Sequence, residues 1–370
     1  MKITLSQPEL SRLASMAGNV VPSKSTLPIL STLLIKADPS AITFSATDLD
    51  LSIIVSSEVE VEKEGVVAVP AKRFSDIVRK LDSVDVTLEH KDKLLSIRCG
   101  RAHFQIPTME ADDFPKLPGT QGLETFMAPA GTFRNMIRRT RFAVSQDLAR
   151  PSMNGIFLEL DSKQITMVAT DGHRLAYFKK AEDLPLESEY GVIIPAKALD
   201  QLMRLLPDEG DIEIGIGENQ CFFKTDSVHL FTRLIEGPFP NYMQVVPKNN
   251  AHDLTVNKDA LLTAVDRVAT LAASLTTRQI KLIIEKDQIA LEVANSEIGK
   301  AREEVEAAYS NDGMTVGYNA IYLLDVLKNL SCEEIRFKLD RADNAGIIEP
   351  MDQGDGEEYF SLLMPLKLSD

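Results

Sequence analysis

The segment Thr170-Asp171-Gly172-His173-Arg174-Leu175 contains the residue types of an acid–base centre. A carboxylate, an imidazole and a guanidinium in one short segment could transfer a proton and stabilise developing charge. An enzyme would also need a nucleophile or a metal partner, and neither is recognisable near this segment. The first third of the chain offers a comparison, because Thr47-Asp48-Leu49-Asp50-Leu51 repeats the Thr-Asp pair without Gly-His-Arg. We therefore interpret the Thr-Asp pair as a repeated turn, in which Asp accepts hydrogen bonds from backbone amides, and Gly172-His173-Arg174 as a turn or binding rim.

Other segments that resemble functional motifs lack the spacing that their chemistry needs. Gly215-Ile216-Gly217-Glu218-Asn219 has no third glycine and lies between predicted strands, which indicates a hairpin turn. Gly354-Asp355-Gly356-Glu357-Glu358 lacks the ligand spacing of an EF-hand and is interpreted as a solvated loop. The three cysteines are isolated, without CxxC spacing. We therefore expect no catalytic residue, no metal and no cofactor.

Cationic residues recur at one position of three predicted helices. Arg79, Arg204 and Lys328 each precede by two residues the leucine that closes its helix. Lys72 and Lys197 lie seven residues before the first two of these, on the same helix face. Solvated helix faces are the ordinary interpretation of such charges. Their recurrence favours a surface that contacts nucleic-acid phosphates without reading sequence, since no base-reading signature accompanies them.

These helices belong to a sequence that is repeated three times. Thr47 and Thr170, for example, lie 123 positions apart. A period of this length is that of a domain rather than of a solenoid repeat. The motifs that close the three copies are Phe114-Pro115, Phe239-Pro240 and Met364-Pro365. The predicted domains are residues 1–124, 125–247 and 248–370.

Each copy is predicted to contain two amphipathic helices and several short strands. Apolar residues at helical spacing predict the first helices over 8–20, 129–145 and 257–274. The second helices are predicted over 74–81, 199–206 and 321–330. Period-two alternation predicts strands such as 156–160, 280–285 and 335–339. Short strands outnumber helices, which indicates an α+β fold with antiparallel sheets.

The composition fits a large globular protein without a membrane segment. The chain has 370 residues, 44% of them hydrophobic, and no stretch approaches 18 consecutive apolar residues. Its beginning has no apolar stretch, so no signal peptide is expected, and an odd number of cysteines argues against a disulfide framework. These features predict a cytoplasmic protein. The net charge of −15 opposes nucleic-acid binding by the average surface, so any such binding must use the clustered cations.

Several segments, taken in order, resemble a known family. They cover the whole chain and are independent of one another. They are Thr26-Leu27-Pro28-Ile29-Leu30, the segment from Ala169 to Ala176, Ile194-Pro195-Ala196-Lys197, the segment from Arg233 to Tyr242, and Met364-Pro365-Leu366-Lys367-Leu368. With these residues the chain resembles the bacterial sliding clamps, the β subunits of the replicative DNA polymerase III.

The resemblance implies three clamp-fold domains, each with two helices packed on antiparallel sheets, in a head-to-tail homodimeric ring with pseudo-sixfold symmetry. Helices would line a hole that encircles duplex DNA without sequence specificity. Such a ring tethers the replicative polymerase for processivity and has no enzymatic activity. The implied partners are a second copy of the chain, double-stranded DNA, the DNA polymerase III α subunit and other polymerases, the clamp loader, and mismatch-repair and other proteins that carry short clamp-binding motifs. No membrane is implied.

The resemblance also implies three sets of site residues. A pocket for partner peptides, between the second and third domains, would contain Met153, Thr170, Gly172, His173, Arg174, Leu175, Pro240, Val245, Asn319, Tyr322, Met364, Pro365 and Leu366. DNA contacts would come from Lys24, Lys72, Arg79, Arg138, Lys197, Arg204 and Lys328. The dimer interface would contain Ile77, Leu81, Phe104, Ile106 and Leu271, with Arg101 and His103 facing Glu303 and Glu304. Gln244, Thr276-Thr277 and the tail Ser369-Asp370 depart from the family pattern, and we expect the first two to change pocket affinity or motif preference.

Two rival interpretations remain at this stage. One is a repeat-built enzyme with Asp171, His173 and Arg174 at its centre. The other is a monomeric adaptor that binds peptides but not DNA. The enzyme requires that His173→Ala abolish a turnover, whereas the clamp requires only that it weaken partner binding.

Overall fold

The computed structural model describes residues 1–295 and 299–368, so Ser296 and the tail Ser369-Asp370 lie outside the described residues. The chain divides into two units. The first consists of residues 1–134 and 197–234, and the second of residues 135–196 and 235–370.

Each sequence repeat contributes two α-helices. They are α1 (Gln7–Gly18), α2 (Ala71–Val78), α3 (Ala130–Thr140), α4 (Ala196–Leu205), α5 (Lys258–Ala272) and α6 (Ala320–Lys328). The predicted starts of α2 and α4 were wrong by three residues, because each helix begins directly after Pro70 or Pro195. Proline lacks an N–H and has a fixed φ, and neither property hinders a position at the start of a helix. The prolines are therefore the better markers of these starts.

The first unit contains two antiparallel sheets. Its strands are β1 (Lys2–Ser6), β2 (Thr32–Asp38), β3 (Ala41–Thr47), β4 (Leu51–Glu58), β5 (Val61–Lys63), β6 (Gly65–Pro70), β7 (Asp85–Lys91), β8 (Leu94–Cys99), β9 (Ala102–Pro107), β10 (Glu124–Pro129), β15 (Asp211–Ile216), β16 (Gln220–Lys224) and β17 (Val228–Arg233). Five strands follow the order β5-β1-β7-β8-β9, and eight follow β10-β15-β16-β17-β4-β3-β2-β6. The pairing of β17 with β4, with Leu230 opposite Ile53, joins strands of the first and second repeats.

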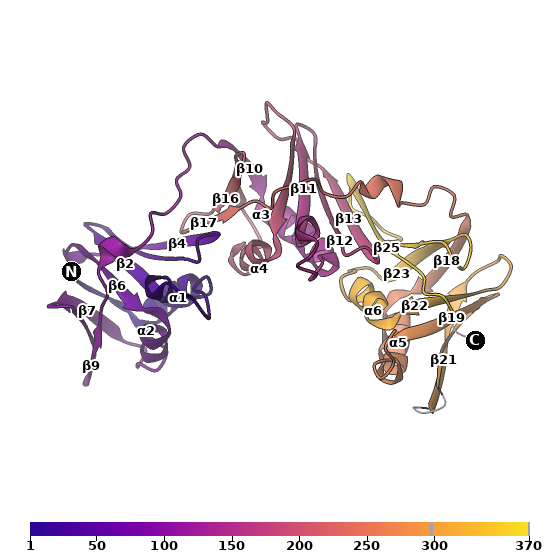
Figure 1. Ribbon diagram of the computed structural model, residues 1–370, viewed down its shortest axis with the longest axis horizontal. Coiled ribbons are helices and arrows are strands. Elements are labelled where there is room, and N and C mark those ends of the chain that lie inside the picture. Colours follow the sequence, from indigo (N-terminus) through magenta and orange to yellow (C-terminus); the bar gives the residue numbers. More distant parts are fainter. Residues whose placement is uncertain (296–298, 369–370) are drawn as a thin grey trace. The chain divides into compact units, whose positions relative to one another are not determined.

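Helices α1 and α2 pack side by side against the β2–β4 side of the larger sheet (Figure 1). Apolar residues spaced by three or four positions give α1 a buried face that includes Leu10, Leu13 and Ala17. Phe74 of α2 is fully buried, and its ring centroid lies 6.0 Å from that of Phe44 on β3. The opposite faces of the two helices are therefore free to carry polar and charged side chains.

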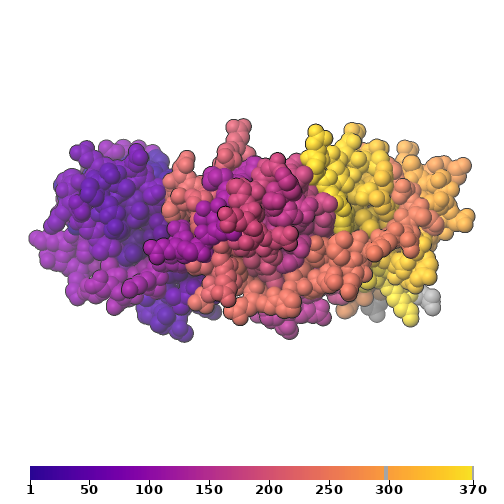
Figure 2. Space-filling model, turned by 90° about the horizontal axis from the view of Figure 1, so that it is seen from above, coloured from indigo at the N-terminus to yellow at the C-terminus, as the bar shows by residue number. Residues whose placement is uncertain are grey.

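Among its described residues, the second unit contains one twelve-stranded antiparallel sheet. Its strands are β11 (Gly155–Asp161), β12 (Gln164–Thr170), β13 (Arg174–Ala181), β14 (Tyr190–Pro195), β18 (His252–Asn257), β19 (Gln279–Glu285), β20 (Gln288–Asn295), β21 (Gly299–Ala308), β22 (Met314–Asn319), β23 (Glu334–Leu339), β24 (Gly346–Pro350) and β25 (Glu357–Leu363). Their order is β14-β11-β12-β13-β25-β24-β23-β18-β21-β20-β19-β22. The pairing of β13 with β25 joins the second repeat to the third, so the magenta surface of the second repeat meets the yellow C-terminal residues in Figure 2.

Helices α5 and α6 pack against each other in the second unit. Asn257 caps α5 by accepting a hydrogen bond from the amide of Ala260. The architecture confirms the predicted α+β fold with antiparallel sheets. No helix in the described part of the chain is long and apolar enough to cross a membrane.

Candidate functional site

The two Thr-Asp segments form the same turn. In the first unit, Asp48 Oδ1 accepts hydrogen bonds from the amides of Asp50 (3.1 Å) and Leu51 (2.7 Å). In the second unit, Asp171 Oδ1 accepts from the amides of His173 (2.9 Å) and Arg174 (3.0 Å). The predicted turn, in which Asp bonds to backbone amides, is therefore confirmed in both copies. Its geometry fixes the direction in which the following side chains point.

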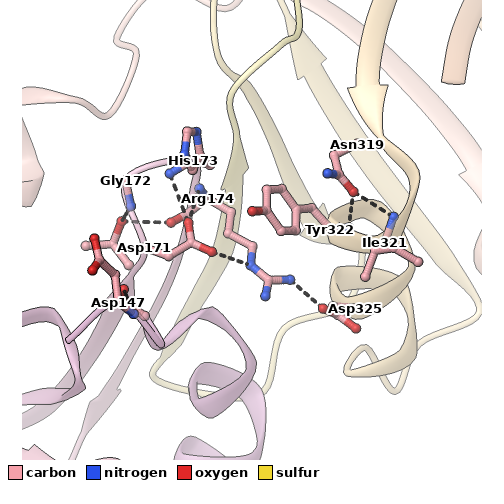
Figure 3. Close-up of polar contacts among 11 residues, drawn as sticks. Asp147, Asp171, Gly172, His173, Arg174, Asn319, Ile321, Tyr322 and Asp325 are labelled. Atoms are coloured by element: carbon pink, nitrogen blue, oxygen red, sulfur yellow. Dashed lines mark hydrogen bonds and ion pairs between the residues drawn. The ribbon is translucent and has the colours of Figure 1, made fainter. Parts of the chain in front are cut away.

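Arg174 has its charge fully engaged within the second unit (Figure 3). Its Nε donates to Asp171 Oδ2 at 3.1 Å, and its Nη1 donates to Asp325 Oδ2 at 2.6 Å. Its guanidinium carbon lies 4.4 Å from the ring centroid of Tyr322 and 5.5 Å from that of Phe142. Because the residue is only 9% exposed, it holds together the elements around it rather than offering a free cation to a ligand.

His173 is exposed and lies beside the same tyrosine. The two rings stack, with centroids 6.2 Å apart and an angle of 24° between their planes. The carbonyl of His173 accepts a hydrogen bond from the amide of Met364 at 2.9 Å. Met364 is itself 42% exposed, so an apolar side chain lies at the surface beside an imidazole. Burial raises the pKa of Tyr322, and nearby Asp171 adds to that effect, so the phenol stays neutral.

Asn319 fixes the start of α6 and hence the position of Tyr322. Its Oδ1 accepts hydrogen bonds from the amides of Ile321 (3.0 Å) and Tyr322 (3.3 Å), and its Nδ2 donates to Thr277 O at 3.3 Å (Figure 3). Leu366 lies near this cap, because its amide donates to Gly317 O at 2.8 Å. The C-terminal segment after β25 thus runs from His173 to the strand that leads into α6.

A buried apolar cluster lies beneath this surface. It contains Val168, Leu175, Tyr177, Ala345 and Leu362. Phe239 and Tyr242, from the segment that links the second and third repeats, pack against it. That segment carries the predicted residues Pro240, which is half-buried, and Val245, which is 54% exposed.

The structure brings seven predicted pocket residues into one connected group. Direct contacts join Thr170, Gly172, His173, Arg174, Asn319, Tyr322 and Met364. Leu175 lies in the cluster beneath them, while Met153 lies in the short helix η4 (Pro151–Met153). Gln244, Thr276 and Thr277 are all exposed.

Sequence reasoning missed three residues of this region. Asp325 follows Tyr322 by three positions on α6, so helical spacing alone would have placed both on one face. The second is Phe142, which packs on Arg174. The third is Arg150, whose side chain lies so close to Gly172 that a Cβ added at position 172 would be 3.2 Å from Arg150 Nη1. No local sequence pattern predicts either contact.

The acid–base interpretation finds no support in these contacts. Both carboxylate oxygens of Asp171 are occupied, one by backbone amides and the other by Arg174. No cluster of three or more His, Cys, Asp or Glu side chains that could hold a metal occurs among residues 1–295 and 299–368. What the arrangement offers is a rigid rim of exposed side chains above an apolar floor, which suits a short peptide.

The cations predicted to contact DNA are exposed, and several have partners. Arg79 pairs with Asp76 at 2.6 Å, Lys328 with Asp266 at 3.9 Å, and Lys197 with Asp48. Arg138 donates to Asn135 and Ser331, each at 3.2 Å. Within the described ranges, no ion pair is found for Lys24, Lys72 and Arg204. Exposed pairs of this kind are weak and can open when a phosphate approaches.

The predicted interface residues differ in exposure. Phe104 is 40% exposed and lines a groove of about 640 Å³ with Ile77, Lys72 and Lys80, whereas Ile106 is 3% exposed. Leu81 and Leu271 are half-buried, and Arg101 and His103 are exposed. Within the same chain Glu303 pairs with Arg267, and Glu304 pairs with Arg302 at 3.0 Å. The two glutamates therefore already have partners in one copy.

Models of the three domains of one family match the chain in order. The N-terminal domain of the DNA polymerase III beta subunit matches residues 1–118, the central domain 128–241 and the C-terminal domain 243–366. The beta sliding clamp of Caulobacter vibrioides is 35% identical over 378 residues, covering 100% of both chains. That of Escherichia coli is 30% identical over 372 residues, again covering 100% of both.

Solved structures show the same similarity. The DnaN sliding clamp of Bartonella birtlesii, in a crystal structure bound to griselimycin, has a TM-score of 0.94 and 35% identity. The DNA polymerase sliding clamp of Bacillus subtilis has a TM-score of 0.93 and 30% identity. Each match covers 100% of this chain and 100% of the other.

Proposed function

The chain belongs to the beta sliding clamp family, the beta subunits of DNA polymerase III, and from this premise we propose how its residues serve the clamp. It is a DNA sliding clamp that confers processivity on a polymerase, and it is not an enzyme. Processivity requires that the clamp stay on DNA while each phosphate contact remains weak and exchangeable. A closed ring meets both requirements, because topology and not affinity prevents its loss.

We propose that two copies close the ring head to tail, through the groove at Ile77 and Phe104 and the region of α5. Complementary charge supports this interface. The groove at Phe104 has three cations, Lys72, Arg73 and Lys80, and one anion, Asp76. A groove of about 600 Å³ between α5 and β21 has four anions, Asp259, Glu303, Glu304 and Glu306, and one cation, Arg267. An interface between two different surfaces is heterologous, and it closes only if the rotation between copies suits.

The DNA-contacting surface is proposed to be the exposed helix faces with Lys24, Lys72, Arg79, Arg138, Lys197, Arg204 and Lys328. The observation in support is their exposure in a chain of net charge −15: six of them lie on or at the ends of α2, α3, α4 and α6, and Lys24 lies on the loop after α1. Contacts of this type give affinity for the phosphate backbone without sequence preference.

The partner site is proposed to be the region around His173, Tyr322 and Met364. The observation that carries this proposal is the pair of hydrogen bonds that Arg174 donates to Asp171 and Asp325. They fix the position of the exposed side chains around His173 above the buried cluster that contains Leu175 and Leu362. Polymerases, the clamp loader and mismatch-repair proteins would insert the apolar side chains of short motifs here. We place this activity in the cytoplasm, where a bacterial chromosome is copied.

Negative-stain imaging of the purified protein without DNA tests the ring first. Open-centred particles with a near-sixfold outline are expected. Compact or elongated single particles at working concentration would contradict the closed ring and favour the monomeric adaptor. Retention on circular DNA, abolished when the circle is cut, then tests topological linkage.

A further inference from the structure

The first unit contains a groove at the turn after Thr47-Asp48. This turn is equivalent to the turn after Thr170-Asp171, which forms part of the proposed peptide site of the second unit. The groove has a volume of about 380 Å³. Its walls come from the turn between β3 and β4, from the segment after Phe114, and from the ends of β16 and β17. None of the residues so far assigned to DNA, to the dimer or to the partner site lines it.

The backbone at this groove repeats that of the second unit. The carbonyl of Asp50 accepts a hydrogen bond from the amide of Arg233 at 2.8 Å, as the carbonyl of His173 accepts from the amide of Met364 at 2.9 Å. Leu49, with φ of 82°, takes the left-handed conformation that Gly172 has in the other turn, with φ of 87°. Arg233 therefore occupies the position of Met364, and Asp50 occupies that of His173.

The walls and the floor of the groove also have counterparts in the proposed peptide site of the second unit. Pro115 lines the groove directly after Phe114, as Pro240 follows Phe239. The buried floor residue is Phe231, which is 3% exposed and lies two positions before Arg233. Leu362 lies two positions before Met364 and is 2% exposed.

The two sites differ in charge. Where the second unit has Met364, the first has Arg233, and where the second has Asn241 after its proline, the first has Lys116. Arg233 approaches Asp50 only to 4.0 Å, and both side chains are mostly exposed, so this ion pair opens readily. Lys116 is exposed and has no ion pair within the described part of the chain. The groove is therefore lined by two cations, Arg233 and Lys116, and by one carboxylate, Asp50. Leu49, which is 51% exposed, gives it an apolar wall.

We propose that this groove is a second peptide site, which takes an extended acidic segment of a partner protein. An apolar side chain of that segment lies against Leu49 and Pro115, and a carboxylate lies between Arg233 and Lys116. A peptide fits better than single-stranded nucleic acid, because Phe231, the aromatic residue among the described lining residues, is buried and offers no face for a base. The proposal rests on the peptide site proposed for the second unit.

The absence of tryptophan from the sequence allows a local test. Gln220→Trp places a fluorescent reporter on the groove, and Gln244→Trp places a matched reporter beside the site of the second unit. Both proteins are titrated with the synthetic peptide Asp-Glu-Leu-Asp-Leu-Phe and with its neutral twin Asn-Gln-Leu-Asn-Leu-Phe. We expect saturable emission change at Gln220→Trp with the acidic peptide, and about tenfold weaker binding of the neutral twin.

Charge reversal supplies the second arm of the test. Lys116→Glu with Arg233→Glu should abolish the response of Gln220→Trp and leave that of Gln244→Trp unchanged, while Lys248→Glu, at an exposed lysine outside the groove, changes neither. A response of Gln244→Trp alone, or equal binding of the two peptides at Gln220→Trp, overturns the second site and leaves the proposed function standing. A response of Gln220→Trp to an oligothymidylate instead of the peptide also overturns it. Silence of both reporters overturns both sites.

Discussion

Arg174 and Asp325 lie 151 positions apart in sequence, and their side chains meet at 2.6 Å in the second unit. The pair ties the turn before β13 in the second repeat to helix α6 of the third. In the first unit Asp48, in the equivalent turn, pairs with Lys197 on α4 of the second repeat. In both units, an ion pair therefore joins the turn of one repeat to the second helix of the next repeat. The turn supplies the cation in the second unit and the anion in the first.

Loss of the Asp325 carboxylate should loosen the rim of the proposed partner site. Asp325→Ala leaves one side of the largely buried Arg174 unpaired, which we expect to cost roughly 1–3 kcal/mol. A lower midpoint of urea unfolding and severalfold weaker binding of a labelled motif peptide, by fluorescence polarisation, are the expected results. Asp266→Ala removes the partner of exposed Lys328 and serves as control. Unchanged peptide affinity in Asp325→Ala would exclude a role for the pair in shaping the rim.

His173→Ala should weaken peptide binding and leave the dimer intact. The substitution removes the ring that stacks on Tyr322 but keeps the backbone carbonyl that bonds to Met364. Peptide titration and sedimentation velocity measure the two properties separately. His252→Ala, at a histidine that contacts Tyr309, is the matched control. Dissociation of His173→Ala into monomers would contradict the assignment of this residue to the partner site.

Charge reversal on the helices should impair retention on DNA without disturbing the fold. In the triple variant Arg79→Glu, Arg204→Glu and Lys328→Glu, the slope of log affinity against log salt should flatten by about 0.9 for each phosphate that the clamp no longer neutralises. Retention on nicked circular DNA across a salt series measures it. The control is the triple variant Lys91→Glu, Lys248→Glu and Lys286→Glu, which changes three exposed lysines elsewhere and alters the net charge by the same amount. Equal effects in both variants would point to net charge and not to a specific surface.

Phe104 and Ile106 should have different roles although both were predicted at the dimer interface. They lie two positions apart on β9 and hence point to one face, but Phe104 is 40% exposed and Ile106 only 3%. Phe104→Ala should lower dimer affinity in sedimentation equilibrium with little effect on thermal stability. Ile106→Ala should destabilise the fold by about 2–5 kcal/mol. The reverse pattern would mean that the groove at Ile77 is not the interface.

The stability of the first unit should fall as the solution is acidified from neutral pH. Burial, followed by the nearby N-terminal amine, lowers the pKa of His90, and burial, followed by Lys224, lowers the pKa of His229. The folded state therefore disfavours protonation, and the unfolded state binds more protons as pH falls through the ordinary value of 6.5. The fall in stability is complete below the depressed folded pKa.

Urea unfolding between pH 7.5 and 5 measures this dependence. His90→Gln with His229→Gln should flatten it, because neither folded nor unfolded chain then carries these two titrating groups. An identical pH dependence in the double variant and the parent chain would assign the effect to other groups.

Local features were predictable from the sequence because they depend on neighbouring residues. The turns at Asp48 and Asp171 form through hydrogen bonds to amides two and three positions away. The helix cap at Asn257 likewise spans three positions. The starts of α2 and α4 were predicted three residues too late, because the prediction did not take Pro70 and Pro195 as the markers of these starts.

The sequence by itself determined the three repeats, the α+β class, the repeated turn and the family. These properties follow from the periodicity of the sequence, from its short motifs and from the order of those motifs along the chain. Tertiary structure alone decided that Arg174 binds Asp325, that Ile106 is covered while Phe104 is not, and that Arg233 takes the place of Met364. The physical reason is that these relationships depend on strand pairing and packing between residues far apart in the chain, where the type of a residue does not specify which distant residue it will meet.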